Sequence, residues 1–420
     1  LSAARIDPTD ATVLANWGNA LFELQHLPEA LAALSRAVRF DATNFGAHYN
    51  RAVVLDALQR PAEALESYVR SAALNPDSAD AHYGRGNALA ALLRLEEAVA
   101  AFDRAAALQP TNADFHFNKA LALLMAGDFR RGWPLYEWRW RTEAVAPLRR
   151  PFAQPKWEGD PLLRGKTVLL HAEQGYGDTL HFCRYAPMVA ARGAIVLLEV
   201  QPAVSALLHT LDGVARVLSR GDPLPAFDLH CPLLSLPLAF GTTLDSVPAT
   251  VPYLHADPAR VARWRERLGP PVRPRVGVVW SGSGGIAYDQ RSLSFEQFAA
   301  ALPPGPEYVC LQKDIRPSDR AALAARADIR IVSDELTDFA ETAALVSLLD
   351  VVVSSDTAAA HLAGALAKPL WLVLAFDPTW RWLVGRSDSP WYPTAKLYRQ
   401  PTLGDWGAPL ADIRRALSAL

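Results

Sequence analysis

Apolar positions follow two different periods along this chain. Over roughly the first third, apolar and small residues recur at helical spacing between short polar turns, which predicts a run of antiparallel helices. From residue 165 onward, short apolar runs such as 167–172 and 194–200 alternate with helical segments. That alternation is typical of an α/β domain with a parallel sheet. The pattern therefore predicts a helical part followed by an α/β part.

The helical part repeats itself with a step of 34 residues. Small residues share one position of the repeat: Ala30, Ala64, Ala98. Large apolar residues share the position four places later: Leu34, Tyr68, Phe102. A unit of this length, with small residues at the helix crossing and a proline closing two units, is the tetratricopeptide pattern of paired helices. We expect a solenoid over residues 1–146, ending in an aromatic junction helix, which either holds a protein or peptide partner or packs against the rest of the chain.

The α/β part is expected to form two domains in tandem. Residues 147–165 are rich in proline and arginine and are predicted to be a linker, with Trp157 as an anchor. Residues 166–268 and 269–420 each alternate strands with helices, and each is predicted to form a Rossmann-like domain. Open sheets of this kind bind ligands at the carboxyl ends of their strands, so we expect both domains to face one cleft.

The stretch 350–376 is predicted to be an inner strand-helix-strand crossover of the second sheet. Asp356 or Thr357 is expected to cap its helix, leaving the first-turn amides near Ala358 at the carboxyl end of a strand, which favours phosphate binding. Thr357 and His361 lie on one face of that helix at i, i+4 spacing. The alternative is an ordinary capped helix whose histidine is satisfied within the core.

A glycine turn over residues 173–178 follows the first strand of the α/β part. It has Gly175 and Gly177, but Leu180 stands where the dinucleotide-binding fingerprint requires a third glycine, so a redox cofactor is disfavoured. The turn is expected to point Asp178 into the cleft as a general base, with Glu173 or His181 beside it. As an alternative, Asp178 serves only as a helix cap.

Polar residues also follow the strand ends of the second domain: Ser281, Ser283, Arg291, Gln312, Lys313. Together with the helix start at Asp356, they are expected to surround a diphosphate. Arg291 offers a fork for phosphate oxygens and Lys313 offers a point charge. The alternative is that Arg291 and Lys313 are solvated surface residues that bind no ligand.

Composition narrows the function classes. A net charge of −2 and a pI near 6.6 argue against a general nucleic-acid or anionic-membrane binder. The three cysteines are scattered, which favours a reducing compartment, and no residue cluster has the spacing of a metal site. Apolar runs are far too short to span a membrane. We therefore expect a cytoplasmic protein that uses neither a metal nor a cofactor.

Several motifs resemble a known family. Residues 177–181 (Gly-Asp-Thr-Leu-His) and 356–361 (Asp-Thr-Ala-Ala-Ala-His) resemble those of heptosyltransferase-type inverting glycosyltransferases. Residues 137–139 (Glu-Trp-Arg), 171–178, 291–293 (Arg-Ser-Leu) and 380–382 (Trp-Arg-Trp) are similar to the bacterial tetratricopeptide-repeat glycosyltransferases of that group, over nearly the whole chain.

The resemblance implies a two-domain GT-B fold and metal-independent transfer from a nucleotide-diphosphate sugar. It makes Asp178 the general base and assigns donor contacts to the turn at Asp356 and Thr357 and to His361. The glycine turn would support the acceptor side through Glu173, Gln174, Gly175 and His181. The chain departs from heptosyltransferases at Ala358, where they usually have glycine, and at Arg291, which replaces a lysine.

Together these observations predict an inverting glycosyltransferase whose repeats recruit a protein, peptide or glycan acceptor. The alternative is a repeat scaffold whose transferase-like half binds a nucleotide or a protein without turnover.

Overall fold

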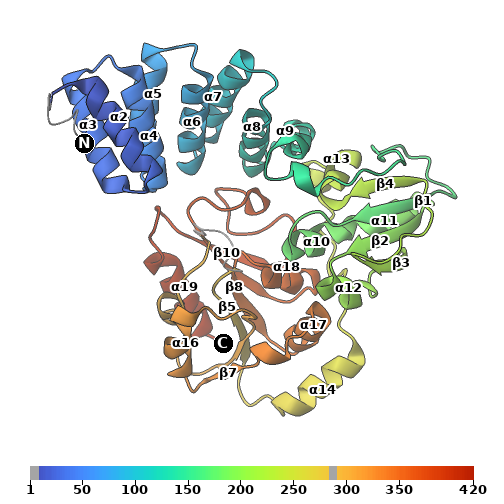
Figure 1. The fold of residues 1–420 in the computed structure, drawn as a ribbon. Coiled ribbons are helices and arrows are strands. Elements are labelled where there is room, and N and C mark those ends of the chain that lie inside the picture. The colour runs from blue at the N-terminus through green and yellow to red at the C-terminus, as the bar shows by residue number, and fades with distance from the viewer. Residues whose placement is uncertain (1–8, 283–290) are drawn as a thin grey trace. The chain divides into compact units, whose positions relative to one another are not determined.

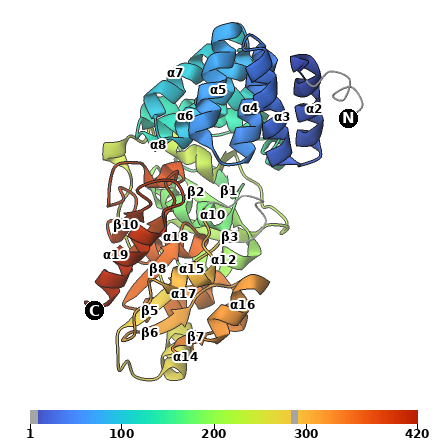
Figure 2. The ribbon, with the colours of Figure 1, turned by 90° about the vertical axis from the view of Figure 1, so that its left-hand side faces the viewer.

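The computed structural model describes residues 9–282 and 291–420, which form two compact units, Leu1–Pro147 and Leu148–Leu420. The first unit is a row of antiparallel helix pairs (Figures 1 and 2). Its helices are α2 (Ala11–Glu23), α3 (Leu27–Phe40), α4 (Phe45–Ala57), α5 (Pro61–Leu74), α6 (Ala79–Ala91), α7 (Leu95–Leu108), α8 (Ala113–Met125) and α9 (Phe129–Tyr136). The 3₁₀ turns η1 (Glu137–Arg141) and η2 (Ala146–Leu148) follow.

Close helix crossings explain the small residues of the repeat. Ala30, Ala64 and Ala98 are fully buried. A Cβ on Gly18 would lie 2.5 Å from Cγ of Leu34, and one on Gly86 would lie 2.5 Å from a ring carbon of Phe102. Helices α2 and α6 can therefore approach Leu34 and Phe102 of their partner helices this closely only because glycine stands at these two positions.

Helix capping repeats with the same step. Asp10, Asn44, Ser78 and Asn112 cap α2, α4, α6 and α8, and each side-chain oxygen accepts a hydrogen bond from an amide of the first turn. Such caps contribute about 1 kcal/mol each, so every unit fixes the start of its own first helix.

The second unit contains two parallel sheets. The first has the strand order β3-β2-β1-β4 and the second has the order β10-β9-β8-β5-β6-β7. The strands are β1 (Thr167–His171), β2 (Ile195–Val200), β3 (Val214–Ser219), β4 (Leu229–Pro232), β5 (Arg275–Val279), β6 (Glu307–Cys310), β7 (Ile329–Ile331), β8 (Val351–Ser355), β9 (Leu370–Leu374) and β10 (Ala395–Arg399). The second sheet has the doubly wound order of dinucleotide-binding folds, with its switch point between β5 and β8.

Helices cover both sheets. They are α10 (Tyr176–Phe182), α11 (Ala186–Ala191), α12 (Pro202–Leu208), α13 (Leu236–Ala239), α14 (Pro258–Leu268), α15 (Phe295–Ala299), α16 (Pro317–Ala324), α17 (Phe339–Ser347), α18 (Ala358–Ala365) and α19 (Gly407–Leu417). Short 3₁₀ turns lie between them: η3 (Cys183–Tyr185), η4 (Leu233–Ser235), η5 (Leu244–Ser246), η6 (Ser333–Glu335) and η7 (Trp380–Trp382).

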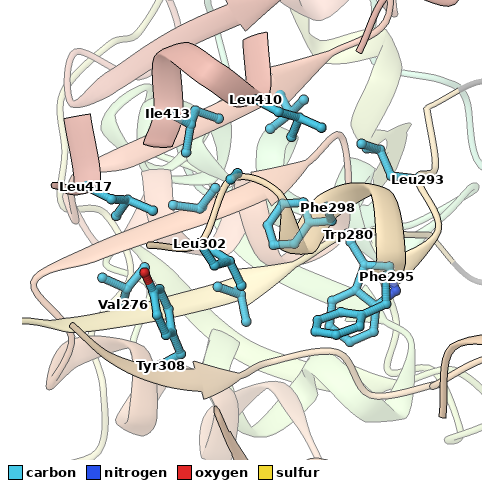
Figure 3. Packing of buried hydrophobic residues seen from close by; sticks show 14 of the residues in the cluster. Val276, Trp280, Leu293, Phe295, Phe298, Leu302, Tyr308, Leu410, Ile413 and Leu417 are labelled. Atoms are coloured by element: carbon cyan, nitrogen blue, oxygen red, sulfur yellow. The ribbon is translucent and has the colours of Figure 1, made fainter. Parts of the chain in front are cut away.

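The core of the second sheet lies beneath α15 and α19. Figure 3 shows Leu410, Ile413 and Leu417 of α19 directed at the sheet, where Val276 and Tyr308 lie. Burying a side chain of this size stabilises the fold by roughly 1.5–3 kcal/mol, so these three residues fix α19 on its face of the sheet.

The segment predicted as a linker is part of the second unit. Residues 148–165 belong to that unit, where the buried indole of Trp157 donates to the carbonyl of Asp160 (3.0 Å) and so anchors the segment.

The chain between β1 and β2 does not form one continuous helix but α10, η3 and α11 in succession. Pro187 lies at the start of α11, where its missing amide costs little.

Candidate active site

A cavity of about 950 Å³ lies at the carboxyl ends of β5, β6 and β8 and beside the start of α10. Most residues predicted from the sequence line it: Gln174, Gly175, Asp178, Ser281, Arg291, Gln312, Lys313, Asp356, Thr357, Ala358, His361. Glu173 and His181 are buried and are not among its lining residues. Ser283 lies outside the described residues. The cavity therefore collects side chains from both α/β halves of the second unit.

Asp178 stands at the start of α10 and has two partners. Its Oδ2 accepts a hydrogen bond from the amide of Gly175 at 3.1 Å, and its Oδ1 forms an ion pair with Arg381. The carboxylate is 17% exposed and lines the cavity. Asp178 is therefore not the N-cap residue of α10, which is Gly175; it is the third residue of the helix, where its carboxylate bonds back to the N-cap amide and also lines the cavity.

The starts of α10 and α18 approach each other closely. A Cβ on Gly177 would lie 2.9 Å from Cδ2 of His361 and 3.5 Å from Cα of Ala358. The backbone of Gly177 is not in the left-handed region, so its conformation does not require glycine. The closeness of α18 does, because a side chain at this position would collide with His361. This contact brings Asp178 to the same cavity as the first turn of α18.

The first turn of α18 differs in detail from the prediction. Thr357 is the N-cap residue, but its hydroxyl lies 3.0 Å from that of Ser354 and makes no capping bond. The carboxylate of Asp356 does not cap the helix either, because its Oδ2 accepts from the hydroxyl of Thr379 at 2.8 Å. The capping role expected for Asp356 is wrong. The amides of Ala358 and Ala359 have no helical acceptor by geometry, and both residues line the cavity.

Residues after β5 and β6 form another wall. The Oε1 of Gln312 accepts from the amide of Ser281 at 3.1 Å and its Nε2 donates to the carbonyl of Ser281 at 2.9 Å, so this side chain holds the end of β5 in place. Among the residues that the structure describes, the buried hydroxyl of Ser281 has no hydrogen-bond partner. Lys313 is exposed and donates to the carbonyl of Ser333 at 3.1 Å. Arg291 lines the cavity beside them.

His361 and His181 meet in the core behind the cavity. The two Nδ1 atoms are 3.3 Å apart, and they lie 2.9 and 3.1 Å from the hydroxyl of Tyr392. Burial lowers the pKa of His361 to about 3, with a further contribution from Arg381, and burial also holds the pKa of His181 well below its usual value. Both rings are therefore neutral. The alternative in which His361 is hydrogen-bonded within the core therefore holds for its Nδ1, although the residue also lines the cavity.

Arg184 extends this buried network. Its guanidinium donates to the carbonyls of His181 (2.8 Å) and Trp391 (2.7 Å) and to the hydroxyl of Tyr253 (2.9 Å). The side chain is almost fully buried, and these bonds join the glycine-turn helix to the segment after β9. A guanidinium held by carbonyls and aromatic rings fixes the two halves of the second unit at one point.

Sequence reasoning missed Arg381, although the motif 380–382 was part of the family resemblance. It also missed other lining residues: Tyr176, Asp338, Phe339, Thr342, Thr379. Of these residues, only Arg381 had a signal in the sequence, because it stands between two tryptophans. In the structure its guanidinium carbon lies 4.5 Å from the ring centre of Trp380.

The described residues contain neither a metal-binding cluster nor a membrane-spanning helix. In residues 9–282 and 291–420, no group of three or more histidine, cysteine, aspartate or glutamate side chains is arranged to hold a metal ion. Within the same ranges, no helix is long and apolar enough to cross a membrane. The three cysteines are buried and form no disulfide with one another.

The fold defines a tetratricopeptide-repeat protein with a C-terminal α/β region of parallel sheets. Models of the tetratricopeptide repeat match residues 18–59, 49–113 and 83–131, which confirms the repeat array. Protein FlbA of Caulobacter vibrioides is 27% identical over 71% of this chain and 54% of FlbA. The chain thus spans about half the length of this curated relative.

Solved structures of repeat proteins also match. YrrB, described as a TPR protein with an unusual peptide-binding site, is 20% identical over 34% of this chain and 74% of its own, with a TM-score of 0.32. The first TPR of Spaghetti (RPAP3) bound to an HSP90 peptide is 29% identical over 28% of this chain and 92% of its own, with a TM-score of 0.27. MamA is 19% identical over 35% of this chain and 86% of its own, with a TM-score of 0.33.

Proposed function

We propose that the chain is an inverting, metal-independent glycosyltransferase of the GT-B type, which transfers a sugar from a nucleotide-diphosphate sugar to an acceptor hydroxyl in the cytoplasm. The observation that carries the proposal is that Asp178, at the start of α10, lies beside the first turn of α18 in the lining of one cavity. The two helices follow strands of different parallel sheets, and open sheets of this kind bind ligands at the carboxyl ends of their strands.

In the proposed reaction, the acceptor oxygen attacks the anomeric carbon from the side opposite the diphosphate. The new carbon–oxygen bond forms as the bond to the phosphate oxygen breaks, and the acceptor proton passes to Asp178. The nucleoside diphosphate leaves with the bonding electrons. Its charge is met by the first-turn amides at Ala358 and Ala359 and by the guanidinium of Arg291.

The donor side has one further feature that fits a polar ligand. The hydroxyl of Ser281 is 2% exposed, lines the cavity and has no partner among the described residues. Buried hydroxyls normally have hydrogen-bond partners, so this one is suited to a phosphate or sugar oxygen. Thr357, which follows the neighbouring strand β8, also lines the cavity and contributes a second hydroxyl.

The repeats are assigned to the acceptor. Tetratricopeptide arrays usually bind peptides or proteins along their concave face. We propose that the array delivers a protein, peptide or glycan acceptor to the second unit.

A second candidate function is a scaffold that binds a nucleotide without turnover. It is favoured by the partners of Asp178, because both carboxylate oxygens already bind N–H donors and an acceptor hydroxyl must compete with them. A panel of nucleotide-diphosphate sugars separates the candidates, since the enzyme releases nucleoside diphosphate and the scaffold does not.

The decisive variant is Asp178→Asn. The amide oxygen can still accept the hydrogen bond from Gly175, so the turn and donor binding are expected to survive while transfer falls by roughly a hundredfold or more. Asp388→Asn is the matched control, because Asp388 is exposed and pairs with Arg386 away from the cavity lining. Wild-type turnover in Asp178→Asn rules out the assignment of the base.

A further inference from the structure

The ion pair between Arg381 and Asp178 joins the two sides of the cavity. Asp178 starts α10 beside the first sheet, whereas Arg381 belongs to η7, which follows β9 of the second sheet. The two side chains are 11% and 17% exposed, so the pair is shielded from solvent but still borders the cavity. Removing one partner of such a shielded pair costs more than at the surface, because it leaves the other charge unpaired and poorly solvated.

Both carboxylate oxygens of Asp178 are engaged in this arrangement. Arg381 binds Oδ1, and the amide of Gly175 binds Oδ2. An acceptor hydroxyl must reach one of these oxygens to hand over its proton, and Arg381 already occupies Oδ1. In the proposed reaction, the acceptor therefore competes with Arg381 for Asp178 until Arg381 binds another anion.

The cavity offers a place for that anion. Arg381 lines the same cavity as Thr357, Ala358 and Arg291, where the donor diphosphate is assigned. A guanidinium binds phosphate through the same fork of N–H donors that it presents to a carboxylate. The ring of Trp380 lies 4.5 Å from the guanidinium carbon and Phe182 lies 5.9 Å from it, so the arginine keeps an apolar support when its partner changes.

Resting on the proposed function, we propose that Arg381 is shared between the base and the donor. In the empty cavity it pairs with Asp178, and when a diphosphate binds it turns to the phosphate and releases the carboxylate for the acceptor. Donor binding would then precede activation of the acceptor hydroxyl. Arg381 is thus a donor-binding residue that also controls the base.

Other charged groups around Asp178 remain constant in this exchange. His361 and His181 are neutral and buried, and Arg184 is held by carbonyls in the core. On the far wall, Asp356 accepts from Thr379. Arg381 is therefore the cation whose exchange directly changes the pairing of Asp178.

The test is a double-mutant cycle with inorganic pyrophosphate, the part that all nucleotide-diphosphate donors share, titrated calorimetrically at one fixed ionic strength. Asp178→Asn in the full chain should tighten pyrophosphate binding roughly tenfold, because it frees Arg381, and Arg381→Ala should weaken binding roughly tenfold or more. In the Arg381→Ala background, Asp178→Asn should change the affinity less than about threefold, since only long-range repulsion is relieved.

Arg381→Lys provides a second variant in case the alanine variant is unstable. It keeps the charge but not the fork, so its affinity should fall between those of wild type and Arg381→Ala. The matched control is the ion pair of half-buried Arg386 with exposed Asp388, neither of which lines the cavity; Arg386→Ala and Asp388→Asn should leave pyrophosphate affinity unchanged.

The outcomes separate this inference from the proposed function. If wild type binds pyrophosphate and Arg381→Ala binds it equally well, or if Asp178→Asn has the same effect in both backgrounds, Arg381 is not shared and only this inference fails. If wild type does not bind pyrophosphate, the donor site and the proposed function fail with it.

Discussion

Acidification is expected to destabilise the second unit through its buried histidine pair. His361 and His181 surround one hydroxyl, that of Tyr392, and the nearby guanidiniums of Arg381 and Arg184 disfavour a further positive charge. Burial lowers the pKa of His361 to about 3, whereas an unfolded histidine titrates near 6.5. Between these values the unfolded chain binds a proton that the folded chain does not, so stability falls as the pH falls from about 6.5.

The size of the effect follows from the unfolded value. At pH 4.5, two units below it, His361 alone favours unfolding by about 2.7 kcal/mol relative to neutral pH. His181 acts in the same direction. Since a folded protein has only about 5–15 kcal/mol of stability, the pair should remove a large part of it before most carboxylates titrate.

The assay is guanidinium unfolding at pH 7.5 and 4.5, on wild type and on His361→Gln, whose amide can bond Tyr392 without gaining a charge. The loss of stability between the two pH values should be about 2–3 kcal/mol smaller in the variant. His26→Gln is the control, because His26 is exposed and lies in the repeat unit. An identical pH dependence in wild type and His361→Gln, or an NMR titration of the His361 ring near pH 6.5, would refute the reasoning.

Three further predictions concern packing, metal and the repeats. Gly177→Ala should destabilise the protein by about 1–3 kcal/mol, because its Cβ would lie 2.9 Å from Cδ2 of His361. Gly175→Ala is the control and should have little effect, since the nearest contact of its Cβ would be an ordinary 3.5 Å. Equal melting temperatures for the two variants would contradict this prediction. The proposed transfer should survive EDTA, because the leaving group is assigned to amides and guanidiniums; activity that is lost and then restored by a divalent ion would contradict it. A chain of Leu148–Leu420 should keep pyrophosphate binding but lose transfer to the natural acceptor, and full transfer by this unit would limit the array to a structural role.

The sequence predicted the repeats and the strands well because both depend on local pattern. The repeated alanines and apolar runs such as 167–172 mark burial directly, and the sites at strand ends follow from parallel topology. The edge strand β10 was missed because Lys396 and Arg399 interrupt its apolar positions and prolines stand nearby. An edge strand is paired on one side only, so its sequence tolerates charges that a central strand does not.

Side-chain pairing could not be predicted from the sequence. Asp178 and Arg381 are 203 residues apart, and the sequence around either residue does not indicate that the other is its partner. The same holds for Asp356. Its carboxylate was expected to cap the helix but instead accepts a hydrogen bond from Thr379, 23 residues later in the chain. Short polar side chains at a helix start have several possible partners, and the tertiary fold decides among them.

The buried Arg184 also sets a time order for folding during synthesis. Its guanidinium needs the carbonyl of Trp391, which lies 207 residues further along the chain. At about 5–20 residues per second, a ribosome takes on the order of 10–40 s to make that stretch. During this interval the nascent first sheet would expose Arg184 and His181, which are both buried in the complete fold. Until Trp391 is made, the incomplete chain is therefore open to chaperones and proteases, and a ribosomal pause or a truncation before Trp391 would prolong that exposure.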